Sequence, residues 1–188
     1  MEKEEIGLIL ESQCNFFASG KTLDIKYRLE NLKKLKKLII QHDQEIKDAL
    51  WKDLHKPECE VISSELNFVL KELNLAIRKL RSWARPKRVR TPIVHFIASS
   101  YISPQPYGQV LILSPWNFPF QLCLVPTVGA LAAGNCVIMK VSQQVPNTSA
   151  VIEKIMNHFD KELIAVISGD HSLSEYLLNY NFDYIFFT

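Results

Sequence analysis

The chain has 188 residues, of which 47% are hydrophobic and 22% charged, and its formal net charge at pH 7 is +2. This length can bury a substantial core, the composition is that of a globular protein, and so small a charge does not by itself imply a polyanionic partner. The first residues, MEKEEIGLILESQ, carry acids where a secretory signal has a basic start and a long apolar core. We therefore expect a cytoplasmic protein.

The spacing of cysteine and histidine indicates neither a metal site nor a redox pair. The four cysteines are Cys14, Cys59, Cys123 and Cys136; they form no C-x-x-C pair, and no histidine lies at zinc-finger spacing. The five histidines form no H-x-x-x-H or H-E-x-x-H pattern. We predict small buried thiols in a reducing compartment and no bound metal.

The first half of the chain has helical periodicity. Between residues 25 and 38, leucine and isoleucine recur at steps of three and four with lysines between them. This pattern predicts an amphipathic helix that Asp24 can cap, and a similar stripe predicts a helix over residues 60–83. A solvated helix face explains the lysines better than a nucleic-acid contact does.

A basic connection and a short hairpin come next. Four basic residues lie between residues 85 and 90, and such a cluster can bind phosphate backbones. No recognition helix or aromatic interleaving accompanies it, so we prefer an exposed connection and expect no nucleic-acid partner. Residues 93–97 have the composition of a β-strand, and Tyr101 and Ile102 could form a second strand that pairs with it. This pattern predicts a hairpin.

From residue 107 onward, short apolar strands alternate with helices. The predicted strands are 109–113, 136–139, 163–167 and 184–187, and the predicted helices are about 118–133, 147–159 and 172–179. Apolar strands separated by helices are typical of a buried parallel sheet with right-handed crossovers, here half of a doubly wound sheet. The predicted fold class is therefore α/β.

One stretch, residues 118–139, is mostly apolar and nominally long enough to span a bilayer. It contains Gln121, Pro126 and a Gly-Asn pair, however, and it lacks a basic flank on its amino-terminal side. It divides better into a helix, a stop and a strand, so we expect no membrane span.

The segment SPWNFPFQL, residues 114–122, follows the first strand of this predicted sheet. Ligands of such sheets bind at the carboxyl ends of the strands. Asn117 lies between Pro115 and Pro119, which restrict the backbone, and its carboxamide is a neutral donor that can face a developing alkoxide without titrating. Asn117 also directly precedes a helix, where asparagine is a favoured cap. Both roles stay open from the sequence.

A second polar group follows the next strand. Lys140 leaves the strand at its carboxyl end, where a cation can donate to the ribose hydroxyls or phosphates of a nucleotide. Gln143, three residues further on, can also reach a ribose hydroxyl. A solvent-exposed lysine that closes a strand is the simpler alternative for Lys140.

Together these motifs closely resemble the aldehyde dehydrogenase superfamily. The family pattern is P-x-G, a short strand, P/T-W-N-[FY]-P, a helix containing proline, A-L-A-x-G-N, and a strand ending in M/L-K. The matching residues here are 106–108, 115–119, 126, 130–135 and 139–140. The sequence ALWKDLHKP (49–57) and the helical start resemble the class 3-like branch, which handles medium-chain, fatty or aromatic aldehydes.

The resemblance implies NAD- or NADP-dependent oxidation of an aldehyde to a carboxylic acid. It implies that Asn117 stabilises the thiohemiacetal oxyanion and that Lys140 binds the adenosine ribose of the cofactor. Ser114 and Trp116 are implied to line the cofactor groove, and Gly169 to lie against its adenine end.

The resemblance also implies a domain organisation. Residues 1–91 would form the helical amino-terminal part of the cofactor domain, and residues 92–105 a hairpin like the family's bridging, oligomerising element. Residues 106–188 would form a partial Rossmann-like domain, the first half of the family's parallel sheet. Members of this branch usually form homodimers, so a second copy is an implied partner beside the aldehyde.

Two departures from the family pattern affect these expectations. Gln143 stands where the family often has glutamate, whose charge repels a 2′-phosphate, so the sequence leaves NAD and NADP both open. The family continues into a G-S-T-x-x-G turn, a glutamate base and a cysteine nucleophile, none of which precedes Thr188. We expect an amino-terminal fragment that is inactive alone. The alternatives are a non-catalytic binding or interaction protein derived from the family, and a helical nucleic-acid binder.

Overall fold

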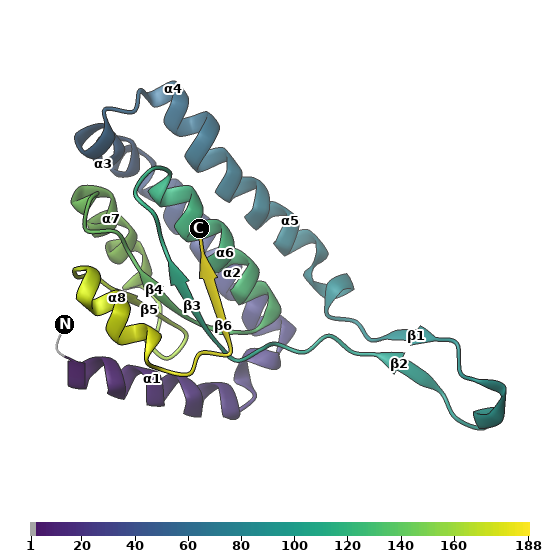
Figure 1. The fold of residues 1–188 in the computed structure, drawn as a ribbon. Helices are drawn as coiled ribbons and strands as arrows, with labels where there is room; N and C mark the ends of the chain where they lie inside the picture. The colour runs from purple at the N-terminus through teal and green to yellow at the C-terminus, as the bar shows by residue number, and fades with distance from the viewer. Residues whose placement is uncertain (1–2) are drawn as a thin grey trace.

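The computed structural model describes residues 3–188 as a four-stranded parallel sheet covered by helices on both faces, with a hairpin that projects from the body (Figure 1). The fold class predicted from the sequence, α/β, is confirmed. The amino-terminal helical elements are α1 (Lys3–Ala18), the 3₁₀ turn η1 (Lys21–Leu23), α2 (Ile25–Gln41), α3 (Asp43–Leu54), α4 (Glu58–Glu60), the π-helical η2 (Val61–Leu66) and α5 (Asn67–Trp83).

The predicted start of α2 is confirmed. The Asp24 carboxylate accepts a hydrogen bond from the backbone N–H of Lys26 at 2.9 Å and so caps the helix. The helix predicted over residues 60–83 is also present, but its first two turns differ from an ordinary α-helix. The short α4 passes into the wider π-helical η2 before α5 begins.

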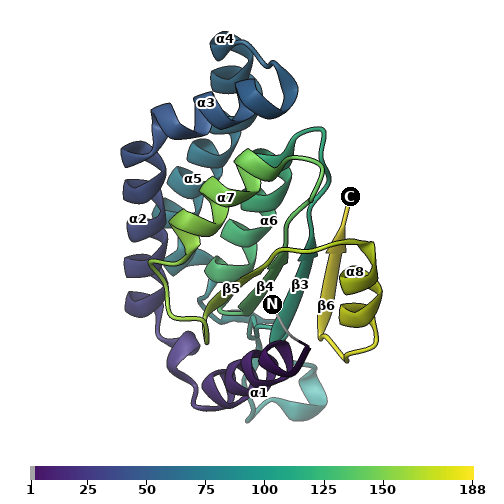
Figure 2. The ribbon, with the colours of Figure 1, turned by 90° about the vertical axis from the view of Figure 1, so that its left-hand side faces the viewer.

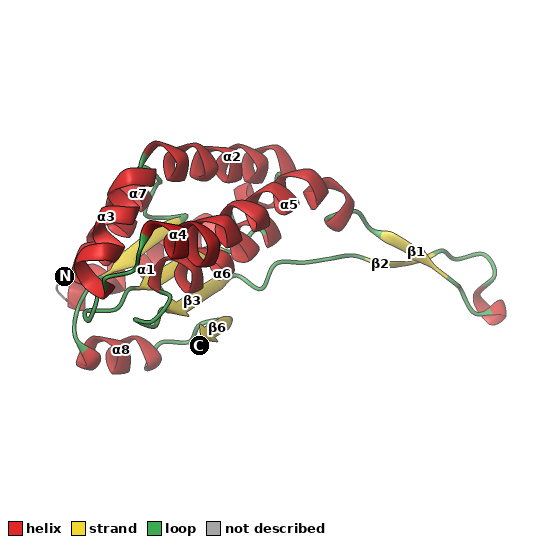
Figure 3. Ribbon diagram, turned by 90° about the horizontal axis from the view of Figure 1, so that it is seen from above, coloured by secondary structure: helices red, strands yellow, loops and turns green. Residues whose placement is uncertain are grey.

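The predicted hairpin is present, and its return strand at Tyr101 and Ile102 is confirmed, but its first strand differs from the prediction. Its strands are β1 (Lys87–Val89) and β2 (Ser100–Ile102), which pair antiparallel, so the prediction of a strand at 93–97 is wrong. A 3₁₀ turn, η3 (Ile93–His95), lies at the hairpin tip instead. The apolar side chains of residues 93, 94, 96 and 97 are between 80% and 89% exposed, so the structure gives them no sheet face to pack against. Figure 3 shows how far the hairpin extends from the helices.

The sheet has the strand order β5-β4-β3-β6, and all its pairs are parallel. Its elements in chain order are β3 (Gln109–Leu113), α6 (Pro119–Ala133), β4 (Cys136–Lys140), α7 (Pro146–Met156), β5 (Ile164–Ile167), α8 (His171–Leu178) and β6 (Tyr184–Phe187). The sequence predicts each of these four strands to within one residue. The strands β3, β4 and β5 are buried, and buried parallel strands are continuous apolar runs bounded by turn residues. β6 is mostly exposed, and its aromatic and β-branched residues favour a strand.

Two hydrophobic clusters hold the layers together. Alternate side chains of the central strands, such as Val110 and Ile112, point to the face covered by α2, α5, α6 and α7. Leu111 points to the opposite face, where it meets side chains of α1 and α8. Figure 2 shows α1 and α8 on the side of the sheet away from α2 and α5. The amino-terminal helices are therefore part of the same core as the sheet.

Two of the four cysteines contradict the sequence prediction of buried thiols. Cys123 and Cys136 are buried in α6 and β4, but Cys14 and Cys59 are exposed. In α1 the neighbouring Gln13 occupies the buried face and leaves Cys14 on the outer one. Within residues 3–188, no helix has the length and hydropathy of a membrane span, since the apolar stretch 118–139 is divided between α6 and β4.

Candidate functional site

The carboxyl ends of three strands form one connected edge. The backbone N–H of Ser114, just after β3, donates to the Lys140 carbonyl at the end of β4 (3.0 Å), and the N–H of Val141 donates to Ile167 of β5 (3.2 Å). From β3 the chain builds the sheet outward through β4 to β5 and then returns to the other side of β3 with β6. The direction of the strand order therefore reverses beside β3, which is where ligands bind in doubly wound sheets.

Lys140 and Gly169, two candidates from separate parts of the sequence, are in contact at this edge. The Lys140 Nζ donates to the Gly169 carbonyl at 2.8 Å, and Lys140 is only 7% exposed. Burial lowers the pKa of Lys140, against the opposing effect of the Asp170 carboxylate. A side chain at Gly169 would place its Cβ 2.5 Å from a methyl carbon of Leu173, so the turn before α8 is closely packed.

The remaining cofactor candidates lie on the outside of this edge. Ser114 is half-buried, and its hydroxyl donates weakly to the Pro119 carbonyl at 3.3 Å. Trp116 is 54% exposed, and Gln143 lies in the exposed turn that precedes α7. Neither Trp116 nor Gln143 makes a side-chain hydrogen bond within residues 3–188, so the structure does not join them to Lys140.

Asn117 is exposed, and it does not cap α6 as the sequence alternative suggested. The capping position is occupied by Phe118. The Asn117 Oδ1 accepts from the N–H of Phe118 at 3.0 Å, which leaves Nδ2 without a hydrogen-bond partner in residues 3–188. Asn117 is one residue too early to reach the first turn, and Pro119 in that turn has no N–H. Asn117 therefore presents a free amide donor in the segment that follows β3.

The residues that hold Asn117 in place, Lys56 and Glu65, were missed by the sequence analysis. The Glu65 Oε2 accepts from the N–H of Gln121 at 2.8 Å and so caps α6 from another helix. The Lys56 Nζ donates to the Asn117 carbonyl at 2.7 Å. One signal was available: Glu65 is a carboxylate on the buried, otherwise apolar face of the predicted 60–83 helix, between Val61 and Val69.

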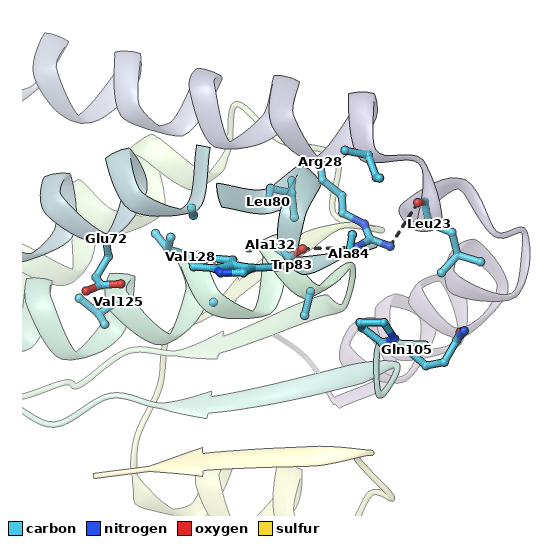
Figure 4. Close-up of a pocket in the computed structure, with 15 residues that line it drawn as sticks. Leu23, Arg28, Glu72, Leu80, Trp83, Ala84, Gln105, Val125, Val128 and Ala132 are labelled. Atoms are coloured by element: carbon cyan, nitrogen blue, oxygen red, sulfur yellow. Dashed lines mark hydrogen bonds between the residues drawn. The ribbon is translucent and has the colours of Figure 1, made fainter. Parts of the chain in front are cut away.

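A cavity of about 510 Å³ lies elsewhere, between α2, α5 and α6. Its lining is mostly apolar and includes the polar side chains of Arg28, Glu72 and Gln105; Figure 4 shows Trp83 between Glu72 and Arg28. The Arg28 guanidinium is used by the backbone, since it donates to the carbonyls of Leu23 (3.2 Å) and Ala132 (3.4 Å). The cavity lies toward the carboxyl ends of α5 and α6, whereas Asn117 precedes α6, so it is separate from the strand-end site.

The described residues, 3–188, provide neither a metal centre nor an activated thiol beside Asn117. Residues 3–188 contain no group of three or more His, Cys, Asp or Glu side chains that could hold a metal. Burial raises the pKa of Cys123 to about 12, against a hydrogen bond with Ser114, and burial also raises the pKa of Cys136 to about 12. Both thiols are therefore protonated and inert at neutral pH.

A parallel sheet with a cation, an amide and a hydroxyl at its carboxyl edge belongs to the open α/β class, whose ligands bind at that edge. Comparison with known proteins specifies the family. The profile of the Aldehyde dehydrogenase family matches residues 2–188. The chain is 42% identical to 4,4'-diaponeurosporen-aldehyde dehydrogenase of Staphylococcus aureus (strain NCTC 8325 / PS 47), over 92% of this chain and 38% of that protein. It is 39% identical to human aldehyde dehydrogenase family 3 member B1, over 98% of this chain and 40% of that protein. The chain therefore belongs to the aldehyde dehydrogenase family.

Solved structures agree with this assignment. The substrate-bound state of Staphylococcus aureus AldH superimposes with a TM-score of 0.95 and 40% identity, over 97% of this chain and 40% of that one. Glyceraldehyde-3-phosphate dehydrogenase GapN from Methanocaldococcus jannaschii, solved in complex with NADP, has a TM-score of 0.81 at 19% identity and shows the shared fold. The chain thus has the aldehyde dehydrogenase fold and spans about two fifths of the length of these relatives.

Proposed function

We propose that this chain supplies the oxyanion donor and part of the cofactor groove of an NAD- or NADP-dependent aldehyde dehydrogenase. In the whole protein, an aldehyde would be oxidised to a carboxylic acid through a covalent adduct with a cysteine thiolate. The observation that carries this proposal is the position of Asn117. Its Nδ2 is an unpaired, neutral donor fixed at the end of a buried strand, in a family whose reaction develops an oxyanion.

The strand-end residues fit a nucleotide. The Lys140 ammonium is held at the carboxyl edge by one acceptor, Gly169, and can donate further to ribose hydroxyls. The Gln143 amide lies in the turn beyond, and Ser114 and Trp116 flank the end of β3. The cofactor, when bound, supplies the hydride acceptor; these residues would bind and orient its adenosine side. Since Gln143 carries no charge to repel a 2′-phosphate, the proposal includes both NAD and NADP.

The 188-residue chain alone is proposed to be without aldehyde dehydrogenase activity. Its two cysteines nearest the motifs, Cys123 and Cys136, are buried with raised pKa values, and no hydrogen bond joins Cys14 or Cys59 to Asn117 within residues 3–188. The purified chain should bind NAD⁺ saturably in a calorimetric titration and produce no NADH when an aldehyde is added. Aldehyde-dependent NADH formation would refute the proposed inactivity, and absence of any nucleotide binding would count against the cofactor groove.

The substrate class of the whole protein is proposed to be a large apolar aldehyde. This rests on the similarity to the Staphylococcus aureus relative, whose name assigns it 4,4'-diaponeurosporen-aldehyde, and to family 3 members. A homodimer is the proposed assembly, supported by the exposed apolar hairpin tip at residues 93–97. The unpaired cysteines support a reducing, cytoplasmic location.

A second candidate is a non-catalytic cofactor-binding or interaction protein derived from the family. The same exposed hairpin tip favours it, since an apolar patch suits an interaction surface without any catalysis. The two candidates differ in what Asn117 does. Both candidate functions predict that Asn117→Ala leaves nucleotide binding intact. Only the aldehyde dehydrogenase proposal predicts that Asn117→Ala, made in a complete enzyme that contains this segment, lowers the activity by about 100-fold or more.

A further inference from the structure

A buried ion pair in the helical half of the chain lies against the segment 114–122. The Lys56 Nζ is 2.5 Å from the Glu65 Oε1, and the side chains are 9% and 0% exposed. Lys56 lies in the loop between α3 and α4, and Glu65 lies in the π-helical η2. π-Helical turns are rare and are found frequently at functional sites. The pair therefore calls for an explanation beyond the packing of two helices.

Each member of the pair has a second partner in the segment that carries Asn117. The Lys56 Nζ donates to the Asn117 carbonyl at 2.7 Å and lies 3.9 Å from the centre of the Phe118 ring. The Glu65 Oε2 accepts from the N–H of Gln121 at 2.8 Å. One ion pair thus holds both ends of a five-residue stretch, from Asn117 to Gln121.

The energetics of such a pair favour a geometric role. Taking two charges out of water costs several kcal/mol per ion, and an apolar pair of similar size is often as stable or more stable. Burial raises the pKa of Glu65, against the hydrogen bonds from Lys56 and Gln121, so the carboxylate depends on these partners for its charge. What an apolar pair cannot provide is the directed bond from Lys56 to the Asn117 carbonyl.

That bond determines which group of Asn117 stays available. The backbone carbonyl is held by Lys56 and the side-chain Oδ1 by the N–H of Phe118, so both oxygens of Asn117 are engaged. In the side chain this leaves Nδ2 as a donor without a partner in residues 3–188. Rotation of the peptide group between Asn117 and Phe118 would break the bond to Lys56 and also move the Phe118 N–H away from Oδ1, because the carbonyl and this N–H belong to one planar group.

We propose that Lys56 and Glu65 are positioning residues for Asn117, holding its turn so that Nδ2 is presented outward from the end of β3. This inference rests on the proposed role of Asn117 as an oxyanion donor. Neither Lys56 nor Glu65 touches the substrate in this arrangement; both act through the backbone of residues 117–121. The competing explanation is that the Lys56–Glu65 pair only stabilises the packing of the amino-terminal helices against α6.

The test uses the ¹⁵N-labelled 188-residue chain and the double variant K56M/E65Q. This variant removes both charges together, retains side-chain size, and keeps an acceptor for the N–H of Gln121. We expect its unfolding temperature to stay within about 4 °C of wild type, since the two charges leave together. The backbone order parameters of Asn117 and Phe118 should fall from about 0.85 to below about 0.6. The side-chain NH₂ resonances of Asn117, identified by their loss in N117D, should move to those of an unstructured asparagine.

Two further variants separate positioning from a role in packing alone. Lys47 is a matched control: its Nζ lies 2.7 Å from both Asp43 and Glu58, its side chain is 13% exposed, and no hydrogen bond or salt bridge joins it to residues 114–122 within the described chain. K47M should leave every Asn117 signal unchanged. K56R keeps a donor for Glu65 and for the Asn117 carbonyl and should retain most of the order. Unchanged Asn117 signals in a folded K56M/E65Q chain would overturn the proposal.

A measurement on the wild-type chain covers the case in which the double variant fails to fold. The Lys56 ammonium should exchange slowly with water and show a through-hydrogen-bond correlation to the Asn117 carbonyl carbon. An ammonium that exchanges freely and lacks this correlation would overturn the proposal without any substitution. If wild type binds no nucleotide but these signals appear as expected, the proposed cofactor function fails and the positioning of Asn117 stands.

Discussion

The Lys140 ammonium donates to the Gly169 carbonyl at 2.8 Å, although 29 positions separate the two residues in the sequence. The bond holds a cation at the carboxyl ends of β4 and β5 before any ligand arrives. Burial lowers the pKa of Lys140, because the ammonium is poorly solvated there, while Asp170 opposes this effect. A ligand hydroxyl that adds a second acceptor would compensate for the lost water. This arrangement favours a binding role over that of a solvent-exposed lysine that merely closes a strand.

Replacing Lys140 by methionine should weaken NAD⁺ binding while leaving the fold intact. A hydrogen bond to a charged group is worth about 1.5–3 kcal/mol, so the dissociation constant should rise about ten- to a hundredfold. Titration calorimetry on both chains measures this ratio. K154M is the control, since Lys154 is exposed and its one salt bridge within residues 3–188 is to Glu45 at 2.7 Å. Equal affinities in K140M and wild type would remove Lys140 from the cofactor groove.

Gln143→Glu should make the chain discriminate against NADP⁺. A carboxylate in the exposed turn before α7 would repel a 2′-phosphate, and a penalty of about 1.4 kcal/mol corresponds to about a tenfold loss of NADP⁺ affinity. NAD⁺ affinity should stay the same or rise, since the carboxylate can accept from ribose hydroxyls. The measurement is the ratio of the two dissociation constants at low ionic strength. A ratio that is unchanged from wild type would show that Gln143 lies away from the ribose.

Three strands of the parallel sheet, β3, β4 and β5, could be predicted from the sequence because they are buried on both faces. The run from Val110 to Leu113 is continuously apolar and lies between Gln109 and Ser114, so its limits are explicit in the sequence. The hairpin could not be predicted in the same way. Its strand β1 (Lys87–Val89) is fully exposed and basic, while the apolar residues 93–97 lie at the tip, so no period of burial marks the pairing.

In the candidate site, the sequence predicted only those residues whose position is evident from the adjacent sequence. Asn117 follows β3 and Lys140 is the last residue of β4, and the carboxyl end of a parallel strand already indicates a ligand edge. The partners of Asn117 are distant: Lys56 is 61 positions away, and Glu65 meets Gln121 across 56 positions. Such contacts depend on how α5 packs on α6. No local sequence pattern predicts these contacts. The one indication is Glu65, a carboxylate on an otherwise apolar helix face.

The four cysteines should divide into two reactive and two protected thiols. Cys14 and Cys59 are exposed, whereas burial raises the pKa of Cys123 and of Cys136 to about 12. At pH 8, about one in ten thousand of such buried thiols is a thiolate, so they react only on unfolding. Iodoacetamide labelling with mass mapping should modify residues 14 and 59 in the native chain and all four in denaturant. Rapid native labelling at Cys123 would contradict the packing of α6.

The amino end of α7 is capped from another helix, by Asp53 of α3. Its Oδ2 accepts from the N–H of Thr148 at 2.7 Å, and its Oδ1 accepts from the side chain of Asn147 at 2.7 Å. Burial alone would raise the pKa of Asp53, but these hydrogen bonds outweigh it and hold the pKa below its ordinary value. The folded state therefore prefers the ionised carboxylate.

Asp53→Asn should destabilise the fold near neutral pH by about 1–2 kcal/mol, the usual loss for a cap, and lower the unfolding temperature by about 2–8 °C. Because the folded pKa is depressed, the stabilisation is complete above the unfolded pKa of about 4 and is lost as pH falls through the folded value. The difference in unfolding temperature between wild type and D53N should be constant from pH 8 to about pH 5 and shrink below about pH 4. Asp48→Asn serves as the control, because the Asp48 side chain has one hydrogen-bond partner in the described part of the chain, the Gln44 side chain on the same helix. A gap that widens on acidification would mean that the carboxylate is protonated in the native cap.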